Sequence, residues 1–564
     1  MNYTERYSFW CSAGLPEDVM AELRSISGNE EELKSRFGGD LQFGTAGMRG
    51  VMGAGSNRLN RYTVRRAAQG MAAWLNTTDL PKKAAIGYDS RHNSRLFAEV
   101  CAVAFAEAGI EAHLYDRLAP TPMLSFAVRE LKCGCGIVIS ASHNSGIYNG
   151  VKCYGPDGCQ MTDEPAAIVT AMIEKIPFFV QETKSFDAYL EEGIIHYIPQ
   201  SLWESYYHTV LREAVDPDMV RNANLNVIYT PLCGTGNEPV RHILNNLNVN
   251  VHIVSCQEKP DGDFKTCEYP NPETDAALNE SYKVAKEVPC DVILGTDPDA
   301  DRVAIAVPDG NSFKKLSGNE LGCLLLDYIL KARSANKDIP DDAITVRSIV
   351  SSPLADKIAA NYGVTMKAVL TGFKYIGGEI LALEEKGEEH KYIFGFEESC
   401  GYLKGTYARD KDAIVASMLI CELAASLKNE GRTILDALDE VYSTYGIYLS
   451  YVQSLELTGA DAMEKAANLM AGLRSNIPAT IGGAAVTCVK DYLARVQLDM
   501  RTGEKTPILL PKSNVLEFIL GDSGSVIARP SGTEPKVKFY YTAVAPTVDS
   551  AQALLDRMKE QMSQ

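Results

Sequence analysis

Short apolar runs followed directly by polar clusters recur along this chain. Four of them have the length of a buried strand and lie at 137–139, 292–294, 392–394 and 526–528. Patterns typical of helices occur at 99–108, 164–176 and 202–214, and a further strand is predicted at 84–88. This alternation predicts an α/β protein whose strands pair largely in parallel. Ligands bind at the carboxyl ends of strands in such sheets, so the polar clusters are the first places to search for chemistry.

The most informative cluster is GTDPDADRV, in which Asp297, Asp299 and Asp301 follow the apolar run 292–294. Three carboxylates after a buried strand predict a site for a hard cation. A calcium loop of the EF-hand kind is excluded, because its sixth position requires Gly and is Arg302, and its twelfth requires Glu and is Pro308. The alternative is a solvated acidic turn, since Asp is common where strands end.

The strand at 137–139 runs into Ser140, Ala141, Ser142, His143 and Asn144. A serine beside a histidine suggests a nucleophile. The GxSxG pattern of an esterase is absent, however, since Ser140 and Asn144 stand where glycines are required. A Ser-rich loop without chemistry is the alternative for this segment alone.

Two further clusters favour binding of a phosphorylated sugar. Glu397 and Ser399 follow the strand at 392–394 and offer hydrogen-bonding oxygens of the kind that recognise sugar hydroxyls, although adjacent glutamates also mark ordinary turns. After the strand at 526–528, an arginine, two hydroxyl residues and a glycine predict a phosphate nest made of Arg529, Ser531, Gly532 and Thr533.

Composition limits the function classes. A chain of 564 residues is expected to form three or four domains. Its 55 basic and 73 acidic residues give a net charge of −18, which opposes nucleic-acid binding. No apolar stretch approaches the ~20 residues of a membrane span. The 14 cysteines are scattered without zinc spacing, and no secretion signal is evident, so we expect a cytoplasmic protein.

Taken together, these motifs resemble the α-D-phosphohexomutase family, the phosphoglucomutases and phosphomannomutases. The serine motif extends to Asn149, Gly150 and Lys152, and the amino-terminal GTAGMRG segment, residues 44–50, and TGFK, residues 371–374, also match. The matching motifs span residues 44 to 533. The sugar loop, with Phe396 before the glutamates and Gly401-Tyr402 after them, is similar to the phosphoglucomutase-2 and phosphopentomutase branch and its bacterial relatives.

The resemblance implies four domains around a central cleft: three similar α/β domains with mixed or parallel sheets, and a smaller α+β domain at the carboxyl end. We place these domains at 1–205 with the serine loop, 206–318 with the metal loop, 319–444 with the sugar loop and 445–564 with the phosphate loop.

The implied reaction interconverts glucose 1-phosphate and glucose 6-phosphate through a phosphoserine at Ser142 and glucose 1,6-bisphosphate, which is both intermediate and activator. One Mg²⁺ per chain is expected on Asp297, Asp299, Asp301 and the phosphorylated Ser142. The implied catalytic residues are Ser142, His143, Lys152, Arg49 and Arg302. The implied substrate-binding residues are Thr371, Gly372, Lys374, Glu397, Ser399, Arg409, Lys411, Arg529, Ser531, Gly532 and Thr533. Arg91 is expected to support the serine loop.

Several alternatives stay open at this point. The family's usual Thr-Ala-Ser-His-Asn-Pro reads Ser-Ala-Ser-His-Asn-Ser here, so Ser140 and Ser145 are departures. Sequence does not rank His143 against Lys152 as the proton acceptor. Phosphopentomutase or phosphomannomutase activity is the alternative within the scaffold, and a catalytically silent sugar-phosphate sensor is the rival class. The expected partners are small sugar phosphates, with no nucleic acid or membrane, and the chain is expected to be a monomer or small homo-oligomer.

Overall fold

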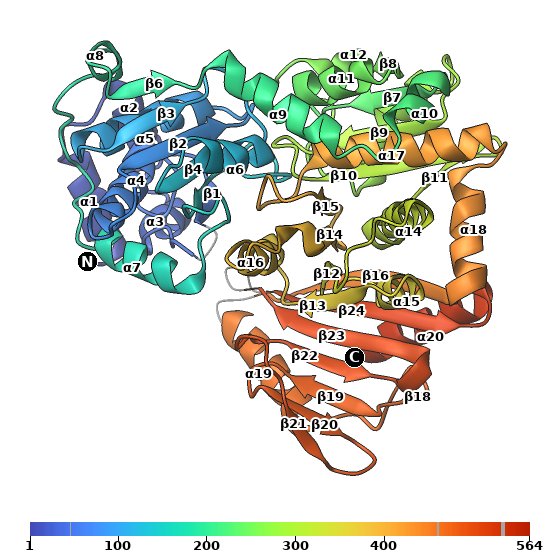
Figure 1. Ribbon diagram of the computed structural model, residues 1–564. Helices are drawn as coiled ribbons and strands as arrows, with labels where there is room; N and C mark the ends of the chain where they lie inside the picture. Colours follow the sequence, from blue (N-terminus) through green and yellow to red (C-terminus); the bar gives the residue numbers. More distant parts are fainter. Residues whose placement is uncertain (45–46, 459–461, 532–535, 564) are drawn as a thin grey trace. The chain divides into compact units, whose positions relative to one another are not determined.

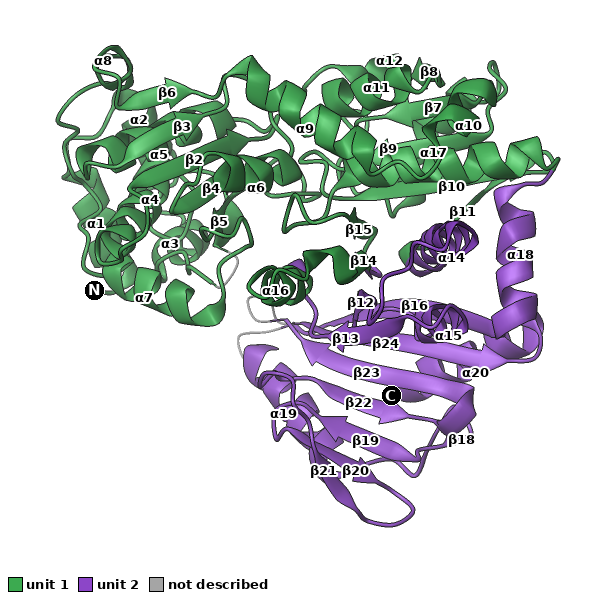
Figure 2. Ribbon diagram, in the orientation of Figure 1, with its two compact units in different colours: residues 1–318, 376–395, 399–431 green, residues 319–375, 396–398, 432–564 purple. Residues whose placement is uncertain are grey.

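The computed structural model describes residues 1–44, 47–458, 462–531 and 536–563, which divide into two compact units. Unit 1 contains residues 1–318, 376–395 and 399–431, and unit 2 contains residues 319–375, 396–398 and 432–564 (Figure 2). Both units are therefore discontinuous in sequence, and the chain passes between them at the end of the predicted sugar-loop strand.

Unit 1 begins with three short helices, α1 (Tyr3–Cys11), α2 (Glu17–Ser25) and α3 (Glu30–Phe37), which precede the first strand. Trp10, Leu23 and Phe37 form the centre of their small apolar core. The rings of Phe178 and Phe179 pack edge-on against Trp10. These helices therefore cover part of the first α/β domain.

The first sheet of unit 1 carries the predicted serine loop (Figure 1). Its strand order is β1 (Met48–Val51), β5 (Tyr148–Tyr154), β4 (Cys135–Ile139), β2 (Lys83–Tyr88), β3 (Glu111–Leu114) and β6 (Ile195–Tyr197). The pairs among β4, β2, β3 and β6 are parallel, whereas β5 is antiparallel to both of its neighbours. The helices of this domain include α4 (Arg61–Asn76), α5 (Ser94–Glu107), α6 (Thr121–Glu130) and α7 (Asp163–Ile173). The predicted α/β alternation is confirmed here, with helix boundaries shifted by a few residues.

The second sheet of unit 1 carries the predicted metal loop. Its order is β11 (Ser312–Lys315), β10 (Val303–Asp309), β9 (Val292–Thr296), β7 (Asn226–Thr230) and β8 (Asn250–Ile253). Strands β7, β8 and β9 pair in parallel, and the metal loop turns the chain from β9 into antiparallel β10. Its helices include α9 (Gln200–Arg212), α10 (Pro217–Asn222), α11 (Asn237–Asn246), α13 (Asp275–Val284) and α17 (Ala413–Asn429). Helix α9 confirms the helix predicted before Pro217.

Unit 2 combines a parallel pair of strands with a larger antiparallel sheet. Strands β12 (Ile344–Ser348) and β13 (Thr365–Val369) are parallel, and α14 (Gly318–Asn336), α15 (Leu354–Asn361) and α18 (Ile434–Tyr445) belong to the same region. The antiparallel sheet has the order β16 (Ile447–Glu456), β24 (Lys536–Ala545), β23 (Gly524–Pro530), β22 (Leu516–Ile519), β19 (Cys488–Asp491), β20 (Val496–Asp499) and β21 (Lys505–Pro507). Residues of α19 (Ala462–Ser475) and α20 (Val548–Met562) pack on it to form one core. The predicted α+β carboxyl-terminal domain is confirmed.

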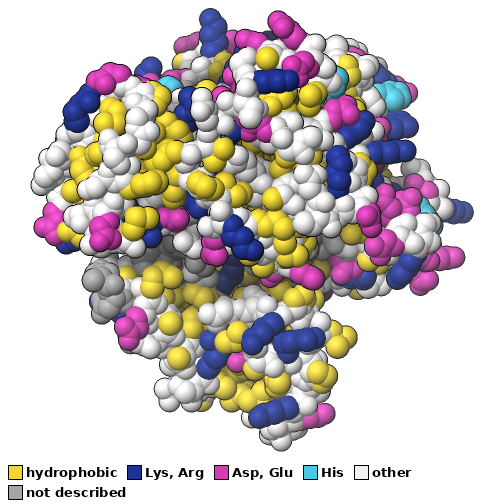
Figure 3. Space-filling model, turned by 90° about the vertical axis from the view of Figure 1, so that its left-hand side faces the viewer, with side chains coloured by type: hydrophobic (Ala, Val, Ile, Leu, Met, Phe, Trp, Pro, Cys, Tyr) yellow, Lys and Arg dark blue, Asp and Glu magenta, His cyan; other side chains and the backbone are white. Residues whose placement is uncertain are grey.

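The surface carries side chains of both charges (Figure 3). Acidic and basic side chains are interspersed on the face drawn in Figure 3, and no field of one sign covers it. Across the described residues, every helix falls short of the length and apolarity needed to cross a membrane.

Candidate functional site

The loop after β4 holds Ser142 in a strained backbone conformation. Ser142 has a φ of 53°, in the left-handed region that residues with a Cβ rarely adopt. Its backbone N–H donates to Ser140 Oγ over 2.8 Å, so the hydroxyl that replaces the family's usual threonine helps to fix the loop. Residues held in this region cost about 1–3 kcal/mol and persist where the surroundings enforce them.

Arg91 is the main support of that loop, as predicted. Its guanidinium donates to the backbone carbonyls of Ser142 (2.6 Å), Ser145 (2.7 Å) and Tyr148 (3.0 Å), and also to that of Asn144. The Arg91 side chain is fully buried, with its Nε 3.2 Å from Asp89 Oδ2. Arg91 therefore acts on the loop backbone and has no surface with which to touch a ligand.

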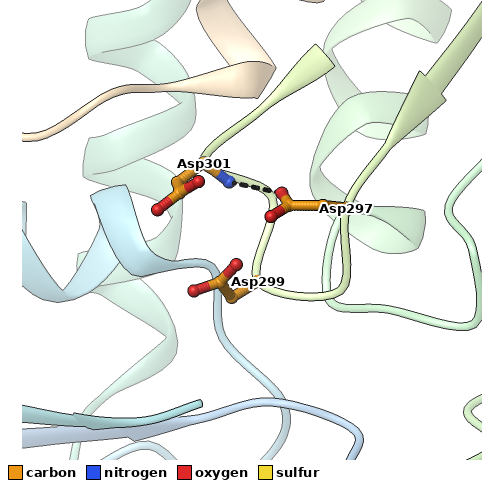
Figure 4. A group of neighbouring side chains, drawn as sticks. All are labelled: Asp297, Asp299 and Asp301. Atoms are coloured by element: carbon orange, nitrogen blue, oxygen red, sulfur yellow. Dashed lines mark hydrogen bonds between the residues drawn. The ribbon is translucent and has the colours of Figure 1, made fainter. Parts of the chain in front are cut away.

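The loop between β9 and β10 gathers three buried carboxylates (Figure 4). Asp297 Oδ1 accepts the backbone N–H groups of Asp301 (3.1 Å) and Arg302 (3.0 Å), which closes the loop on itself. Ala300 takes a left-handed φ of 50° at the turn. One oxygen from each of Asp297, Asp299 and Asp301 lies within 4.8 Å of the others, a spacing suited to a shared cation.

One carboxylate oxygen of Asp299 and one of Asp301 accept hydrogen bonds from ammonium or hydroxyl groups. Lys152 Nζ donates to Asp299 Oδ2 (2.6 Å) and Asp301 Oδ2 (2.9 Å). Lys411 Nζ lies 3.3 Å from Asp301 Oδ2, and Thr121 Oγ1 donates to Asp299 Oδ2 over 2.9 Å. The buried Oδ1 atoms of both aspartates have no hydrogen-bond partner among the described residues. Two orphaned carboxylate oxygens in one buried loop fit a divalent cation.

The electrostatics of this cluster follow from its pairing. Burial opposes ionisation of Asp299 and Asp301, but nearby cations outweigh it and lower the pKa of both carboxyls. Lys152 is the main cation for both, and Lys411 and Arg302 add to its effect on Asp301. Burial together with the negative charges of Asp299 and Asp301 raises the pKa of Asp297 well above its usual value. Burial also disfavours the Lys152 ammonium, yet the two aspartates raise its pKa. Lys152 is therefore held as a cation beside ionised carboxylates.

The serine loop and the metal loop meet. Ser142 Oγ donates to Asp297 Oδ2 over 2.8 Å and lies 3.1 Å from His143 Nδ1. Removal from water, together with the positive charges of Arg302 and Arg49, lowers the pKa of His143 well below its usual value. A neutral imidazole can accept a proton, whereas Lys152 has its donors directed at carboxylates.

Two predicted catalytic arginines flank these loops. Arg49, on β1, is exposed and donates from Nη1 to Asn144 Oδ1 of the serine loop over 3.3 Å. Arg302 follows the metal loop, and its Nη1 donates to Glu273 Oε1 over 2.6 Å. Two positively charged side chains therefore lie beside the serine and metal loops. They could stabilise the negative charge of a phosphoryl group on Ser142.

Arg409 and Lys411, which sequence assigned to substrate binding, are both buried in unit 1. Arg409 donates from Nη2 to Glu384 Oε2 over 2.7 Å and from Nη1 to nearby backbone carbonyls. Lys411 Nζ donates to Asp410 Oδ1 over 2.9 Å, beside its contact with the metal loop. Their present partners are protein carboxylates, and their contact with substrate stays a prediction.

In unit 2 the predicted sugar-binding segments converge. Glu397 ends β14 (Tyr392–Glu397), and its Oε1 accepts the N–H of Gly372 over 2.7 Å. Gly372 has a φ of 121°, a conformation for which glycine is suited. The buried Oγ1 of Thr371 has no hydrogen-bond partner among the described residues, so one hydroxyl beside Glu397 is available to a ligand. Lys374, at the start of α16 (Phe373–Glu384), has its ammonium 5.1 Å from the ring centre of Tyr375.

The predicted phosphate loop begins inside a strand. Arg529 lies within β23, one residue beyond the predicted end of that strand, and Ser531 donates its N–H to Lys536 O over 2.8 Å. Gly532 and Thr533 lie outside the described residues. Tyr540, on β24, is 6% exposed; its burial, with Glu398 nearby, raises its pKa, and its hydroxyl hydrogen-bonds the Arg529 side chain. The negative charge of Glu397 also raises the pKa of Tyr540.

Sequence reasoning missed several residues of this site. Thr121, Glu273 and Tyr540 come from segments without a recognisable motif, and each enters through a tertiary contact. Ser399 was predicted correctly to follow a strand, but it lies just after the chain has returned to unit 1. Its contact with a sugar stays a prediction.

Family models and a curated relative match most of this chain. Models of alpha/beta/alpha domains I, II and III of phosphoglucomutase/phosphomannomutase match residues 40–179, 204–310 and 317–445, and that of the C-terminal domain matches residues 493–561. The phosphoglucomutase of Staphylococcus epidermidis is 37% identical over 529 residues, which cover 93% of this chain and 94% of the relative.

Solved structures show the same fold. A putative phosphomannomutase from Thermus thermophilus superposes with a TM-score of 0.69 at 22% identity, covering 93% of this chain and 100% of that one. The phosphoglucomutase pp63/parafusin from Paramecium, in its open form, gives 0.68 at 17% identity, covering 94% and 95%. With four domain models matched in order and a curated relative aligned over nearly its whole length, the chain belongs to the phosphoglucomutase/phosphomannomutase family.

Proposed function

We propose that this protein is a phosphoglucomutase that interconverts glucose 1-phosphate and glucose 6-phosphate. The observation that carries the proposal is the contact of Ser142 Oγ with Asp297 Oδ2 at 2.8 Å, beside two further carboxylates that each have one oxygen without a hydrogen-bond partner among the described residues. A hydroxyl placed against a cation-binding carboxylate cluster suits a phosphoryl-carrying serine. Curated phosphoglucomutases at 36–37% identity support the choice of sugar.

The proposed cation is one Mg²⁺ per chain on Asp297, Asp299 and Asp301, with a phosphate oxygen on Ser142 as a further ligand. The site fits Mg²⁺, because it offers carboxylate oxygens only. When bound, Mg²⁺ would neutralise charge on the transferring phosphoryl group. Arg302 and Arg49 would add positive charge on the same side of the serine loop.

The reaction proceeds by two transfers. The sugar hydroxyl attacks the phosphorus of phosphorylated Ser142, a new P–O bond forms to the sugar, and the bond from phosphorus to Ser142 Oγ breaks. In balance, the sugar hydroxyl loses a proton and Ser142 Oγ gains one. The resulting glucose 1,6-bisphosphate turns over and returns its other phosphoryl group to Ser142 Oγ. Throughout, the ring hydroxyls would be held by Glu397, Ser399 and Thr371, and the distal phosphate by Arg529 and its loop.

His143 is the proposed proton acceptor and donor for Ser142 Oγ. Its Nδ1 lies 3.1 Å from that oxygen, which suits it to take the hydroxyl proton when Ser142 attacks the bisphosphate and to return a proton when Oγ leaves. The attacking sugar oxygen approaches from the opposite side of the phosphorus. Lys152, by contrast, donates to two carboxylates at 2.6 and 2.9 Å and would have to lose both bonds to act as a base. Lys152 is therefore assigned to charge balance in the metal loop.

The test is a panel of sugar 1-phosphates assayed with Mg²⁺ and a trace of the matching 1,6-bisphosphate (1,5-bisphosphate for the pentose). The highest kcat/KM is expected for glucose 1-phosphate. A higher kcat/KM for ribose or mannose phosphate would reassign the substrate within the family, and binding without turnover of any sugar phosphate would indicate a sensor. We further propose a cytoplasmic monomer or small homo-oligomer, and the scattered spacing of the 14 cysteines in the sequence supports that location.

A further inference from the structure

Helix α6 begins at a residue that contacts the metal loop twice. Thr121 is the first residue of α6 and is completely buried. Its backbone N–H donates to the main-chain carbonyl of Asp299 over 2.9 Å, and its Oγ1 donates to Asp299 Oδ2, also over 2.9 Å. Thr121 therefore fixes both the backbone and the side chain of one aspartate.

These two bonds determine which oxygen of Asp299 is free. Oδ2 receives donors from both Thr121 and Lys152, whereas the buried Oδ1 has no partner among the described residues. A carboxylate with a single donor can still rotate about its Cβ–Cγ bond. A second donor on the same oxygen, anchored to a helix, opposes that rotation and presents Oδ1 in one orientation.

The location of Thr121 adds an electrostatic component. The amino terminus of a helix carries partial positive charge, which favours a carboxylate at its end. Pro120 and Pro122 flank Thr121 and restrict its backbone, so the hydroxyl is presented from a rigid turn. Helix α6 belongs to the domain that carries Ser142, and Asp299 belongs to the domain that carries the metal loop. The contact thus couples the two halves of the serine–metal site within unit 1.

We propose that Thr121 is a positioning residue for the divalent cation: it holds Asp299 in the orientation that binds metal. This inference rests on the proposed metal-dependent function. It concerns a residue without direct metal contact, so its effect is expected in metal affinity, while sugar-phosphate binding at saturating metal stays the same.

The test measures Mn²⁺ binding to metal-free protein by the loss of the free-ion electron paramagnetic resonance signal. Thr121→Val removes the hydroxyl with little change of volume and is expected to raise the Kd for Mn²⁺ about 10–100-fold. Thr121→Ser keeps the hydroxyl and is expected to stay close to wild type. Ser125→Ala is the matched control, because Ser125 is a buried hydroxyl on the same helix that donates to Gly158 O instead. Loss of the bound ion in Asp301→Asn identifies the aspartate cluster as its site.

The outcomes separate this inference from the proposed function. A Kd for Thr121→Val equal to wild type, or an equal loss in Thr121→Ser or Ser125→Ala, would overturn the role of the hydroxyl. Wild-type protein that binds no Mn²⁺ would overturn the metal-dependent function as well. If circular dichroism shows that Thr121→Val does not fold, the Kd of Thr121→Ala for Mn²⁺ is compared with those of wild type and Thr121→Ser instead. In turnover assays, the metal concentration for half-maximal rate should rise with the Kd, with KM for the sugar phosphate unchanged at saturating metal.

Discussion

Replacing Arg91 by lysine tests how much the hydrogen bonds from Arg91 to the serine loop contribute to catalysis. Arg91 donates to the backbone carbonyls of Ser142, Asn144, Ser145 and Tyr148. Lysine keeps the positive charge next to Asp89 but offers three donors at one point, in place of the five spread over a guanidinium. At least one buried carbonyl of the loop must therefore lose its partner.

The size of the effect follows from that loss. A hydrogen bond to a charged group contributes about 1.5–3 kcal/mol, and the left-handed conformation of Ser142 itself stores about 1–3 kcal/mol. Loss of about 1.5–3 kcal/mol from the loop lowers the ratio of molecules with Ser142 in place to molecules with a relaxed loop about 10–150-fold, at 1.36 kcal/mol per decade, and kcat should fall by up to that factor. Because the Arg91 side chain is fully buried, KM for the sugar phosphate should change little.

The assay follows kcat and KM for glucose 1-phosphate, together with the rate of Ser142 phosphorylation by glucose 1,6-bisphosphate. The control is Arg95→Lys, since Arg95 is 62% exposed and forms its ion pair with Glu99 on the surface of α5. A kcat for Arg91→Lys within twofold of wild type, with unchanged thermal stability, would refute the view that Arg91 holds the reactive serine. A rise in KM without loss of kcat would refute it equally.

Three further results are expected. Ser142→Ala should abolish both the phosphoprotein and mutase turnover, and phosphopeptide mapping that finds the label on Ser140 would contradict the assignment. Arg529→Ala should weaken sugar monophosphate and bisphosphate binding about 10–150-fold, because a charge-assisted bond to phosphate contributes roughly 1.5–3 kcal/mol; unchanged KM for both ligands would make the loop structural. Burial raises the pKa of Glu422 to about 7, although N–H bonds from Val215 and Asp216 oppose this shift. The protonated carboxyl therefore stabilises the folded protein. This stabilisation is complete below about pH 4.5 and is lost as the pH rises through about 7. Denaturant unfolding should therefore show wild type losing up to about 3 kcal/mol relative to Glu422→Gln between pH 4.5 and 8, and a pH-independent difference would be inconsistent with that titration.

The amino-acid sequence by itself determined the α/β class and the nature of each functional loop. Apolar runs at 137–139 and 292–294 become β4 and β9, because a short apolar segment bounded by turn residues is buried as a strand. The residues that define the chemistry of each loop lie close together in sequence, as with Asp297, Asp299 and Asp301. Their function can therefore be predicted without knowledge of the fold. The support of the serine loop by Arg91 was also accessible, since Asp89-Ser90-Arg91 ends a predicted strand beside it.

Tertiary structure alone decided how those loops are used. That Ser142 takes a left-handed φ, and that Lys411 serves the metal loop, depend on partners remote in sequence. The same is true of Thr121, whose hydroxyl donates a hydrogen bond to Asp299, 178 positions away in sequence. Local periodicity reports which face of an element is buried, but hydrogen bonds between loops depend on the packing of whole domains. The residue types at the site were therefore predictable from sequence. Only the tertiary contacts determine which carboxylate oxygens remain available to bind a cation.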